Sequence, residues 1–176
     1  MDESACYLLP FVAHSWAPRG QTPLLVEQAG RTHLSGRRCD LIAAISPTGR
    51  LYLAGQDQPF SSDDICWFLT KLCWHYRRQN LVVVWDGAAI HRSQTVKSWL
   101  HSRPGRVHLE RLPAYSPMLN PVELLWSQLK RSLKNRVFTS LESLQTAVMS
   151  EVDFLQADRE RIRCFFRKKE IAFFTD

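Results

Sequence analysis

The feature that most constrains the fold is a run of five apolar residues, Leu81 to Trp85, in which hydrophobic and polar side chains do not alternate. A strand with one solvated face shows such an alternation, whereas a strand covered on both faces does not. Parallel strands are of the covered kind, because the helices that connect them pack on both faces of the sheet. The run therefore predicts a covered strand in an α/β sheet, and Asp86 and Gly87 follow it directly.

Strand and helix patterns alternate around this run. Apolar segments from Asp40 to Ser46 and from Arg50 to Ala54 flank the turn Pro47-Thr48-Gly49, which predicts a hairpin. Apolar residues recur at helical spacing after Ser61 or Ser62, either of which is a good N-cap. Further elements are predicted at residues 93–102 (helix), 107–112 (strand), from 121 (helix), near 140 (helix) and at 158–172 (helix). This order indicates one mixed-sheet α/β domain over residues 1–176.

Composition excludes several classes of protein. Lys and Arg total 23 against 17 Asp and Glu, so the net charge is +6, which weakly favours a polyanionic partner. No apolar run exceeds five residues, whereas a membrane-spanning helix needs about 20. The start, Met1-Asp2-Glu3-Ser4, is acidic where a signal peptide is basic. Five Cys without a C-x-x-C pair argue against a disulfide framework or a zinc ribbon, so we expect a cytoplasmic protein with no membrane partner.

Asp86 is the first candidate functional residue, because it ends the most hydrophobic strand. In open α/β sheets, ligands bind beyond the carboxyl ends of the strands. Gly87 lets the backbone turn there without covering the carboxylate. The alternative is that Asp86 only caps the turn that follows it.

Glu123 has two alternative interpretations. Asn120 is a good N-cap and Pro121 suits the first helical position, so Glu123 falls where a capping box places an acidic side chain. On a helical wheel, however, Glu123 lies at the edge of the apolar stripe of the same helix. A carboxylate at a core margin beside lysines either holds a metal ion next to a phosphate backbone or belongs to a solvated face with compensating charges. The residues on its flank are Asn120, Ser127, Lys130 and Lys134.

The sequence around Asp2 and Glu3 does not by itself indicate a functional site. An acidic N-terminus is ordinarily a solvated end of the chain. Only a resemblance to a known family gives Asp2 a role.

Four blocks of the sequence together resemble the catalytic domain of DDE transposases of the mariner superfamily, in the form found in bacterial insertion sequences. The blocks are Asp2-Glu3-Ser4, Trp16-Ala17-Pro18-Arg19-Gly20, Trp85-Asp86 with His91, and Leu112-Pro113-Ala114-Tyr115-Ser116-Pro117-Met118-Leu119-Asn120-Pro121-Val122-Glu123. Trp126 and Lys130 continue the last block as the family does. The last block is the specific one, and the resemblance covers nearly the whole chain.

The resemblance implies a ribonuclease H-like fold, a five-stranded mixed sheet flanked by helices. It implies three catalytic and metal-binding carboxylates: Asp2 from the first strand, Asp86 from the fourth, and Glu123 from the helix after the fifth. Two Mg²⁺ or Mn²⁺ ions would serve cleavage and strand transfer on double-stranded DNA, with water and then a 3′-OH as attacking groups. A homodimer that pairs two element ends at the nucleoid is also implied. The expected phosphate or DNA contacts are His91, Asn120, Lys130 and Lys134.

The chain departs from the family at its start. Family members carry helix-turn-helix modules before this domain, and none precedes Asp2 here. We also expect the first strand to be truncated, because the family strand begins several residues before the first acid. These departures favour an alternative function, an inactive truncated remnant that only binds DNA or assembles with a partner. The block from Leu112 to Glu123 argues against a third alternative, a ribonuclease H-like nuclease of other specificity.

Three further features have open interpretations. His91 contacts the scissile phosphate, orders the loop after Asp86, or makes only a local hydrogen bond. Trp67 and Trp74 mark an interface or pack beneath the C-terminal helices. A set of basic residues near the C-terminus either binds phosphate or is simply solvated. These residues are Arg159, Arg161, Arg163, Arg167, Lys168 and Lys169.

Overall fold

A computed structural model describes residues 1–8, 11–14, 16–21 and 37–171. The strands are β1 (Asp2–Tyr7), β2 (Arg38–Ile45), β3 (Leu51–Gln56), β4 (Leu81–Trp85) and β5 (Val107–Arg111). The helices are α2 (Ser62–His75), α3 (Gln94–His101), α4 (Val122–Ser132), α5 (Leu141–Ala157) and α6 (Arg159–Phe165), with 3-10 turns η1 (Ile90–Arg92) and η2 (Pro117–Leu119). Among these helices there is none whose length and apolar character would let it cross a lipid bilayer.

The strands form two sheets in place of the predicted single sheet of five. β2 pairs antiparallel with both β1 and β3, and Asp2 lies opposite Ala43. β4 and β5 pair in parallel. Between β1 and β4 the amino group of Met1 donates a hydrogen bond to the carbonyl of Val84 at 2.8 Å. In the described residues this bond is not continued as a ladder, and β1 and β4 stay in separate sheets.

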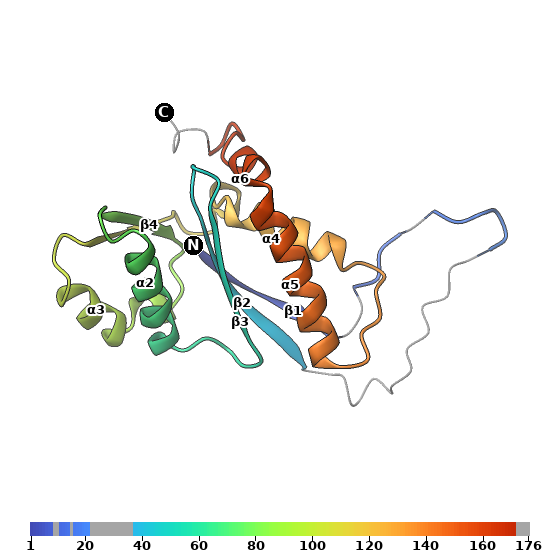
Figure 1. The fold of residues 1–176 in the computed structure, drawn as a ribbon, viewed down its shortest axis with the longest axis horizontal. Helices are drawn as coiled ribbons and strands as arrows, with labels where there is room; N and C mark the ends of the chain where they lie inside the picture. Colours follow the sequence, from blue (N-terminus) through green and yellow to red (C-terminus); the bar gives the residue numbers. More distant parts are fainter. Residues whose placement is uncertain (9–10, 15, 22–36, 172–176) are drawn as a thin grey trace.

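Side chains of the three-stranded sheet point alternately into two cores. Leu41 and Ala43 of β2 pack into a core shared with α4, α5 and α6. Ile42, between them, packs into a second core shared with α2 and β4. Figure 1 shows the resulting layers, with α4, α5 and α6 on one side of the sheet and α2, α3 and β4 on the other. The architecture is therefore α/β, as predicted, with helices on both sides of the strands.

Helix α2 begins where the sequence predicts. Ser61 is the N-cap: its Oγ accepts a hydrogen bond from the Asp64 amide at 3.2 Å, and the Asp64 carboxylate accepts one from the Ser61 amide at 2.8 Å. This capping box satisfies two amides that the helix itself cannot bond. The helix ends at His75, and residues 76–80 then lead into β4.

Two predicted packing arrangements are wrong. Strand β4 is not covered on both faces, because Val82 is 66% exposed and borders an open cavity of ≈ 380 Å³ that reaches Asn120. Trp67 and Trp74 do not pack beneath the C-terminal helices. They are 49% and 65% exposed, because the buried side of α2 is its opposite face.

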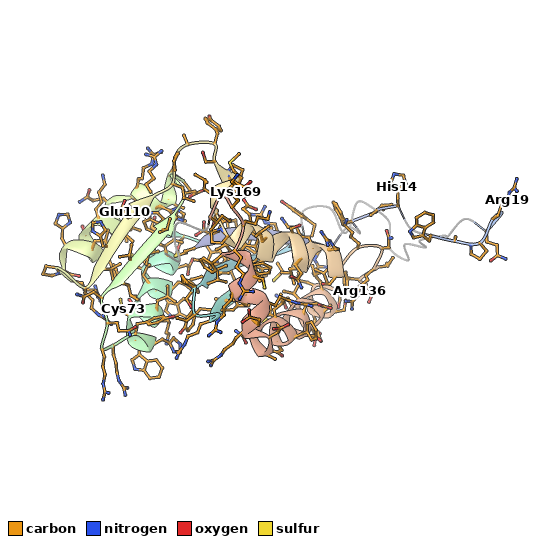
Figure 2. All side chains as sticks on the ribbon, turned by 90° about the horizontal axis from the view of Figure 1, so that it is seen from above. His14, Arg19, Cys73, Glu110, Arg136 and Lys169 are labelled. Carbon is orange, nitrogen blue, oxygen red and sulfur yellow. The ribbon has the colours of Figure 1, made fainter. Side chains whose placement is uncertain are left out.

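The last predicted helix is shorter than expected. Helix α6 ends at Phe165, where we predicted a helix to about residue 172, which lies outside the described residues. The Phe166 amide bonds to the carbonyl of Arg163, three residues back, which tightens the last turn. His14 and Arg19 lie far from the two cores, at the other end of the view in Figure 2.

Candidate active site

Asp2 is a buried carboxylate at the start of β1, in a residue only 7% exposed. Trp126 of α4 donates its indole N–H to Oδ2 of Asp2 at 3.0 Å. Burial, and then the negative charges of Glu123 and Glu3, raise the pKa of Asp2 from 3.8 to about 7. The ionised form of Asp2 is therefore costly in these surroundings, and a nearby cation would stabilise it.

Asp86 follows the last residue of β4, and its side chain is 51% exposed. Its Oδ1 accepts a hydrogen bond from the Ala88 amide at 3.0 Å and lies 2.9 Å from Nδ1 of His91. Both contacts use the same oxygen, and among the described residues Oδ2 has no hydrogen-bond partner. Asp86 thus caps the turn, as one interpretation predicts, and still presents a carboxylate oxygen to a ligand.

His91 is buried, with 1% of its side chain exposed, and it joins two acidic residues. Its ring stacks on Trp85 with centroids 4.3 Å apart, and its Nε2 lies 2.9 Å from Oε1 of Glu3. Burial would lower the pKa of His91, but the bond to Glu3 and the charges of Glu3 and Asp86 outweigh it, so that the pKa is raised. With both ring nitrogens engaged, the geometry supports the interpretation that His91 orders the loop after Asp86.

Glu123 lies in the first turn of α4 and is exposed. Pro121 is the N-cap residue, and the buried Asn120 before it supports the first turn, since its Oδ1 accepts a hydrogen bond from the Val122 amide at 3.2 Å. The Asn120 amide is bonded to the carbonyl of Pro117, so the capping-box position for Glu123 is already taken. The carboxylate of Glu123 is therefore not needed to start the helix, although its charge acts on Asp2.

The three carboxylates line one open cavity of ≈ 320 Å³. Asp2 comes from β1, Asp86 from the end of β4, and Glu123 from α4. The fold thus brings together residues that are far apart in the sequence, as the resemblance implies. The other residues that line this cavity include Asn120, Gly87, Arg111, Tyr115 and Ser116.

The donor chemistry of this cavity suits a hard divalent cation, because Mg²⁺ and Mn²⁺ prefer carboxylate oxygens. The repulsion between Asp2 and Glu123 is also of a kind that a bound cation relieves. In residues 1–8, 11–14, 16–21 and 37–171, no three His, Cys, Asp or Glu side chains already surround a common metal position. Binding an ion would therefore require the exposed carboxylates of Asp86 and Glu123 to move toward Asp2.

Arg111 is a site residue that the sequence analysis missed. It ends β5, and its guanidinium lies so close to Gly87 that a Cβ at residue 87 would overlap it. The absence of a side chain at Gly87 thus lets a positive charge lie next to Asp86. A signal was available, since Arg111 ends the strand paired in parallel with β4, where ligand sites form.

Tyr115 is a second missed residue, at the rim of the acidic cavity. Its φ of 55° lies in the left-handed region, and its side chain is 99% exposed. Such a backbone conformation is uncommon for a residue with a side chain and clusters at functional sites. No local sequence signal predicts it, because Tyr is not a residue that favours this region.

Of the predicted DNA contacts, Lys130 and Lys134 do not line the acidic cavity. Both are exposed, and Nζ of Lys134 lies 5.5 Å from the ring centroid of Phe11. Lys168 instead lines a neighbouring cavity of ≈ 260 Å³ together with Asn120 and Glu123. Lys168, from the C-terminal part of the chain, thus lines a cavity together with one of the acidic residues, Glu123.

Comparisons with known proteins found similar sequences over most of the chain. A family model described as DDE superfamily endonuclease matches residues 1–145. A 39 kDa protein of the insertion element IS630 from Shigella sonnei is 32% identical over 131 residues, which are 73% of this chain and 36% of that protein. The Tcb1 transposase of Caenorhabditis briggsae is 29% identical over 143 residues, which are 75% of this chain and 49% of that protein.

Solved structures support the fold. The Mos1 strand transfer complex superposes with a TM-score of 0.68 at 20% identity, covering 99% of this chain and 53% of that chain. The catalytic domain of Mos1 mariner transposase gives a TM-score of 0.59 at 14% identity, covering 98% and 80%. The α/β fold, of the ribonuclease H-like class expected from the resemblance, is thereby confirmed. The chain spans half or less of the length of the curated relatives it matches. Since the family model matches most of its residues, the chain belongs to the DDE superfamily endonucleases.

Proposed function

We propose that this chain cleaves DNA and transfers DNA strands, as a transposase, through a metal site formed by Asp2, Asp86 and Glu123. The observation that carries the proposal is the convergence of these three carboxylates on one cavity. The similarity to the Tcb1 transposase and to Mos1 strand transfer complexes supports the same chemistry.

The proposed cofactor is a pair of Mg²⁺ or Mn²⁺ ions, in keeping with Mos1 paired-end complexes that hold Mg or Mn. Asp2, Asp86 and Glu123 would hold these ions. Ions of this kind activate an attacking oxygen and stabilise a leaving oxygen during in-line displacement at phosphorus. The protein groups then have to position the carboxylates and the phosphate.

Two neighbours position the carboxylates. The indole of Trp126 fixes Oδ2 of Asp2, and the imidazole of His91 fixes Oδ1 of Asp86, which leaves the other oxygen of each carboxylate for a ligand. Contacts that orient a metal-binding side chain typically change metal affinity or activity by roughly 10- to 100-fold. Arg111 adds a positive charge at the cavity wall, where the phosphate of the substrate would lie.

The proposed substrate is double-stranded DNA, and the active form is a homodimer that pairs two element ends. The net charge of +6 and the likeness to the Mos1 paired-end complex support these two assignments. His91 acts as a positioning residue, while Asn120, Lys130, Lys134 and Lys168 remain candidates for DNA contact. Such a protein would act on nucleoid DNA in the cytoplasm.

We also propose that residues 1–176 form one catalytic domain in which β1 and β4 are neighbours in a five-stranded mixed sheet. The bond from the Met1 amino group to Val84 supports this neighbourhood.

Nicking of supercoiled plasmid DNA tests the proposed function. The purified chain should nick in Mg²⁺ or Mn²⁺ and not in EDTA. Asp86→Asn and Glu123→Gln should each slow nicking by about a hundredfold or more, because each removes a metal-binding charge. Both residues are exposed, so circular dichroism should show unchanged folding.

Asp63→Asn, at an exposed acid of α2 outside the cavity, is the control and should nick normally. Nicking that persists in EDTA, or in both acidic-site variants, would overturn the proposal.

The second candidate function is a remnant that binds DNA without cleaving it. It is favoured by one observation, that three metal-binding side chains are not already gathered among the described residues. A folded protein that binds DNA but does not nick it in either metal would establish this alternative.

A further inference from the structure

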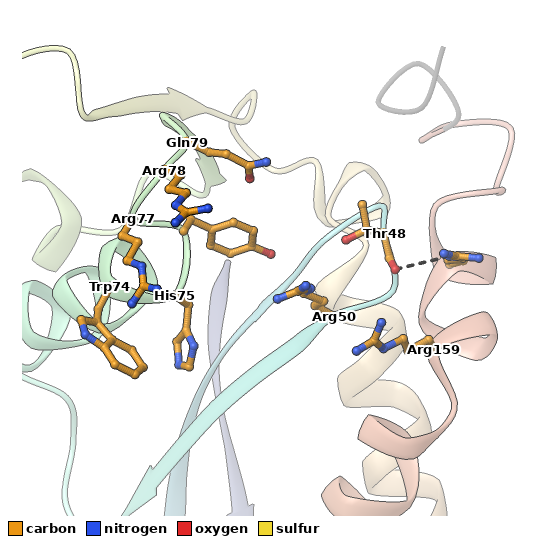
Figure 3. Close-up of a pocket in the computed structure, with 10 residues that line it drawn as sticks. Thr48, Arg50, Trp74, His75, Arg77, Arg78, Gln79 and Arg159 are labelled. Atoms are coloured by element: carbon orange, nitrogen blue, oxygen red, sulfur yellow. Dashed lines mark hydrogen bonds between the residues drawn. The ribbon is translucent and has the colours of Figure 1, made fainter.

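A second cavity, which we call the arginine cleft, lies at the opposite end of β4 from Asp86. Its volume is ≈ 670 Å³. Its walls are the end of α2 with the residues that follow, the turn between β2 and β3, and the start of α6 (Figure 3). Five arginines and a tryptophan are among the residues that line it: Arg50, Arg77, Arg78, Arg159, Arg163 and Trp74.

The positive charges of the arginine cleft are poorly neutralised. Arg163 pairs with Glu160 at 3.5 Å and donates from Nε to the carbonyl of Thr48 at 3.3 Å. In the described part of the chain, no acidic residue lines the cleft and no ion pair involves Arg77, Arg78 or Arg159. Guanidinium groups that share a cleft repel one another, and a polyanion relieves that repulsion.

The walls of the cleft are already in place. Gly49 has a φ of +82°, and a Cβ at this position would overlap the carbonyl oxygen of Arg159, so the turn lies directly against the start of α6. The bond from Arg163 to Thr48 joins the same two segments (Figure 3). Across the cleft, the guanidinium of Arg50, from the same turn, lies 5.9 Å from the ring centroid of Tyr76 on the facing wall. A ligand would therefore meet walls, and the charges of Arg50 and Arg163, whose positions are set before binding.

The shape and chemistry of the cleft fit a nucleic-acid backbone. Arginine presents a planar fork of donors that matches phosphate oxygens. The guanidinium groups lie on both walls of a wide, open cavity, which suits a row of phosphates more than one small anion. Trp74, 65% exposed at the edge, offers an apolar surface to a sugar or a base.

A third, open cavity along β4 lies between the arginine cleft and the acidic cavity. It shares Thr48, Tyr76 and Gln79 with the arginine cleft and Asn120 with the acidic cavity. The five residues of β4 place roughly 17 Å between its first end, at the arginine cleft, and its last end, at the acidic cavity. That length corresponds to about five nucleotides of one DNA strand. We propose that the arginine cleft binds the phosphate backbone of the same DNA that enters the acidic cavity, about five nucleotides from the point of cleavage; this rests on the proposed function.

DNA binding by a cleft variant tests this assignment. Arg77→Gln/Arg159→Gln removes one exposed guanidinium from each wall and leaves the bonded Arg163 in place. Affinity for a labelled duplex, measured from about 50 to 200 mM salt, should fall about tenfold at low salt, and the slope of log affinity against log salt should decrease by about 1.8. The matched control is Lys97→Gln/Arg136→Gln, two exposed cations outside the cleft. Figure 2 shows Arg136 far from Cys73, the neighbour of Trp74, and this variant should keep both the affinity and the slope.

The outcomes separate this proposal from the proposed function. If the cleft variant binds DNA like the control while Asp86→Asn loses nicking, the assignment of the cleft is wrong and the cleavage function stands. If binding depends on the cleft but the wild-type chain never nicks, the cleft assignment stands and cleavage is wrong. A wild-type chain that neither binds nor nicks DNA would overturn both.

Discussion

Asp2→Asn is expected to stabilise the metal-free chain above neutral pH and at the same time to abolish DNA cleavage. The amide keeps an acceptor for the indole of Trp126 and removes a buried negative charge. It also removes one of the three carboxylates proposed to hold the metal ions. A residue whose charge serves only catalysis should show these opposite effects.

The sign of the stability effect follows from the pKa of Asp2. Burial, and then the charges of Glu123 and Glu3, raise this pKa from 3.8 to about 7 in the folded chain. Stability due to the protonated carboxyl is therefore complete below about pH 4, declines as the pH rises, and is lost above about pH 7. The difference between the folded and the ordinary pKa of Asp2 corresponds to ~4 kcal/mol of stability at most. We therefore expect Asp2→Asn to raise the free energy of unfolding by about 2 kcal/mol or more at about pH 8.

Urea unfolding without divalent metal, at about pH 5 and about pH 8, measures this effect. The difference between Asp2→Asn and wild type should grow with pH. The stability contributed by the amino group of Met1 instead rises with pH, because burial lowers the pKa of this group to about 6. Asp2→Asn removes a negative charge that raises this pKa, so the Met1 contribution also makes the difference between the two proteins grow with pH. Asp40→Asn is the control: Asp40 is also buried, but Arg38 donates to it at 2.7 Å, so this variant should lose stability and keep cleavage. Lower stability of Asp2→Asn at the higher pH, or nicking at the wild-type rate, would contradict the role assigned to Asp2.

Gly49→Ala is expected to destabilise the chain by about 3 kcal/mol or more, from two separate causes. The φ of +82° costs an L-residue about 1 to 2 kcal/mol. The new Cβ would also overlap the carbonyl oxygen of Arg159 and lie 3.0 Å from its carbonyl carbon. These are backbone atoms, so the turn or the start of α6 must shift, and the overlap adds the cost of an overpacked contact.

A second glycine separates the two causes. Gly105 has a similar φ of +70°, and a Cβ there would meet no heavy atom within 4 Å. Gly105→Ala should therefore cost only about 1 kcal/mol, from the backbone alone. The midpoints of urea unfolding of the two variants give the difference. Equal losses for Gly49→Ala and Gly105→Ala would show that the contact with Arg159 contributes nothing.

Elements set by local pattern could be predicted from the sequence. The period of apolar residues and the choice of Ser61 or Ser62 as N-cap place the start of α2 within a residue, and the apolar run gives the bounds of β4. The division into two sheets was not predicted, because the pairing of β1 with β4 depends on the tertiary fold and not on a local pattern. The exposure of Val82 follows from the same arrangement.

In the candidate site, too, a local pattern predicts some residues and only the tertiary fold brings the others together. The position of Asp86 follows from strand order alone, whereas Asp2 has no local signal and was assigned only by resemblance. The bond between His91 and Glu3 joins residues 88 positions apart, and that between Trp126 and Asp2 joins residues 124 apart. Such pairs depend on the tertiary fold. The arginine cleft likewise combines the end of α2 with the start of α6, so its charges could be counted in the sequence but not placed together.

Replacing Asp86 by Cys tests most directly whether its side chain touches a metal ion. Mg²⁺ requires hard oxygen ligands, whereas the transition ion Mn²⁺ accepts a thiolate more readily. Asp86→Cys should therefore fail to nick plasmid DNA in Mg²⁺ and recover measurable nicking in Mn²⁺, while Asp86→Ser, which cannot supply a thiolate, should be inactive in both. Nicking at the wild-type rate in Mg²⁺ by either variant would contradict a metal site at Asp86.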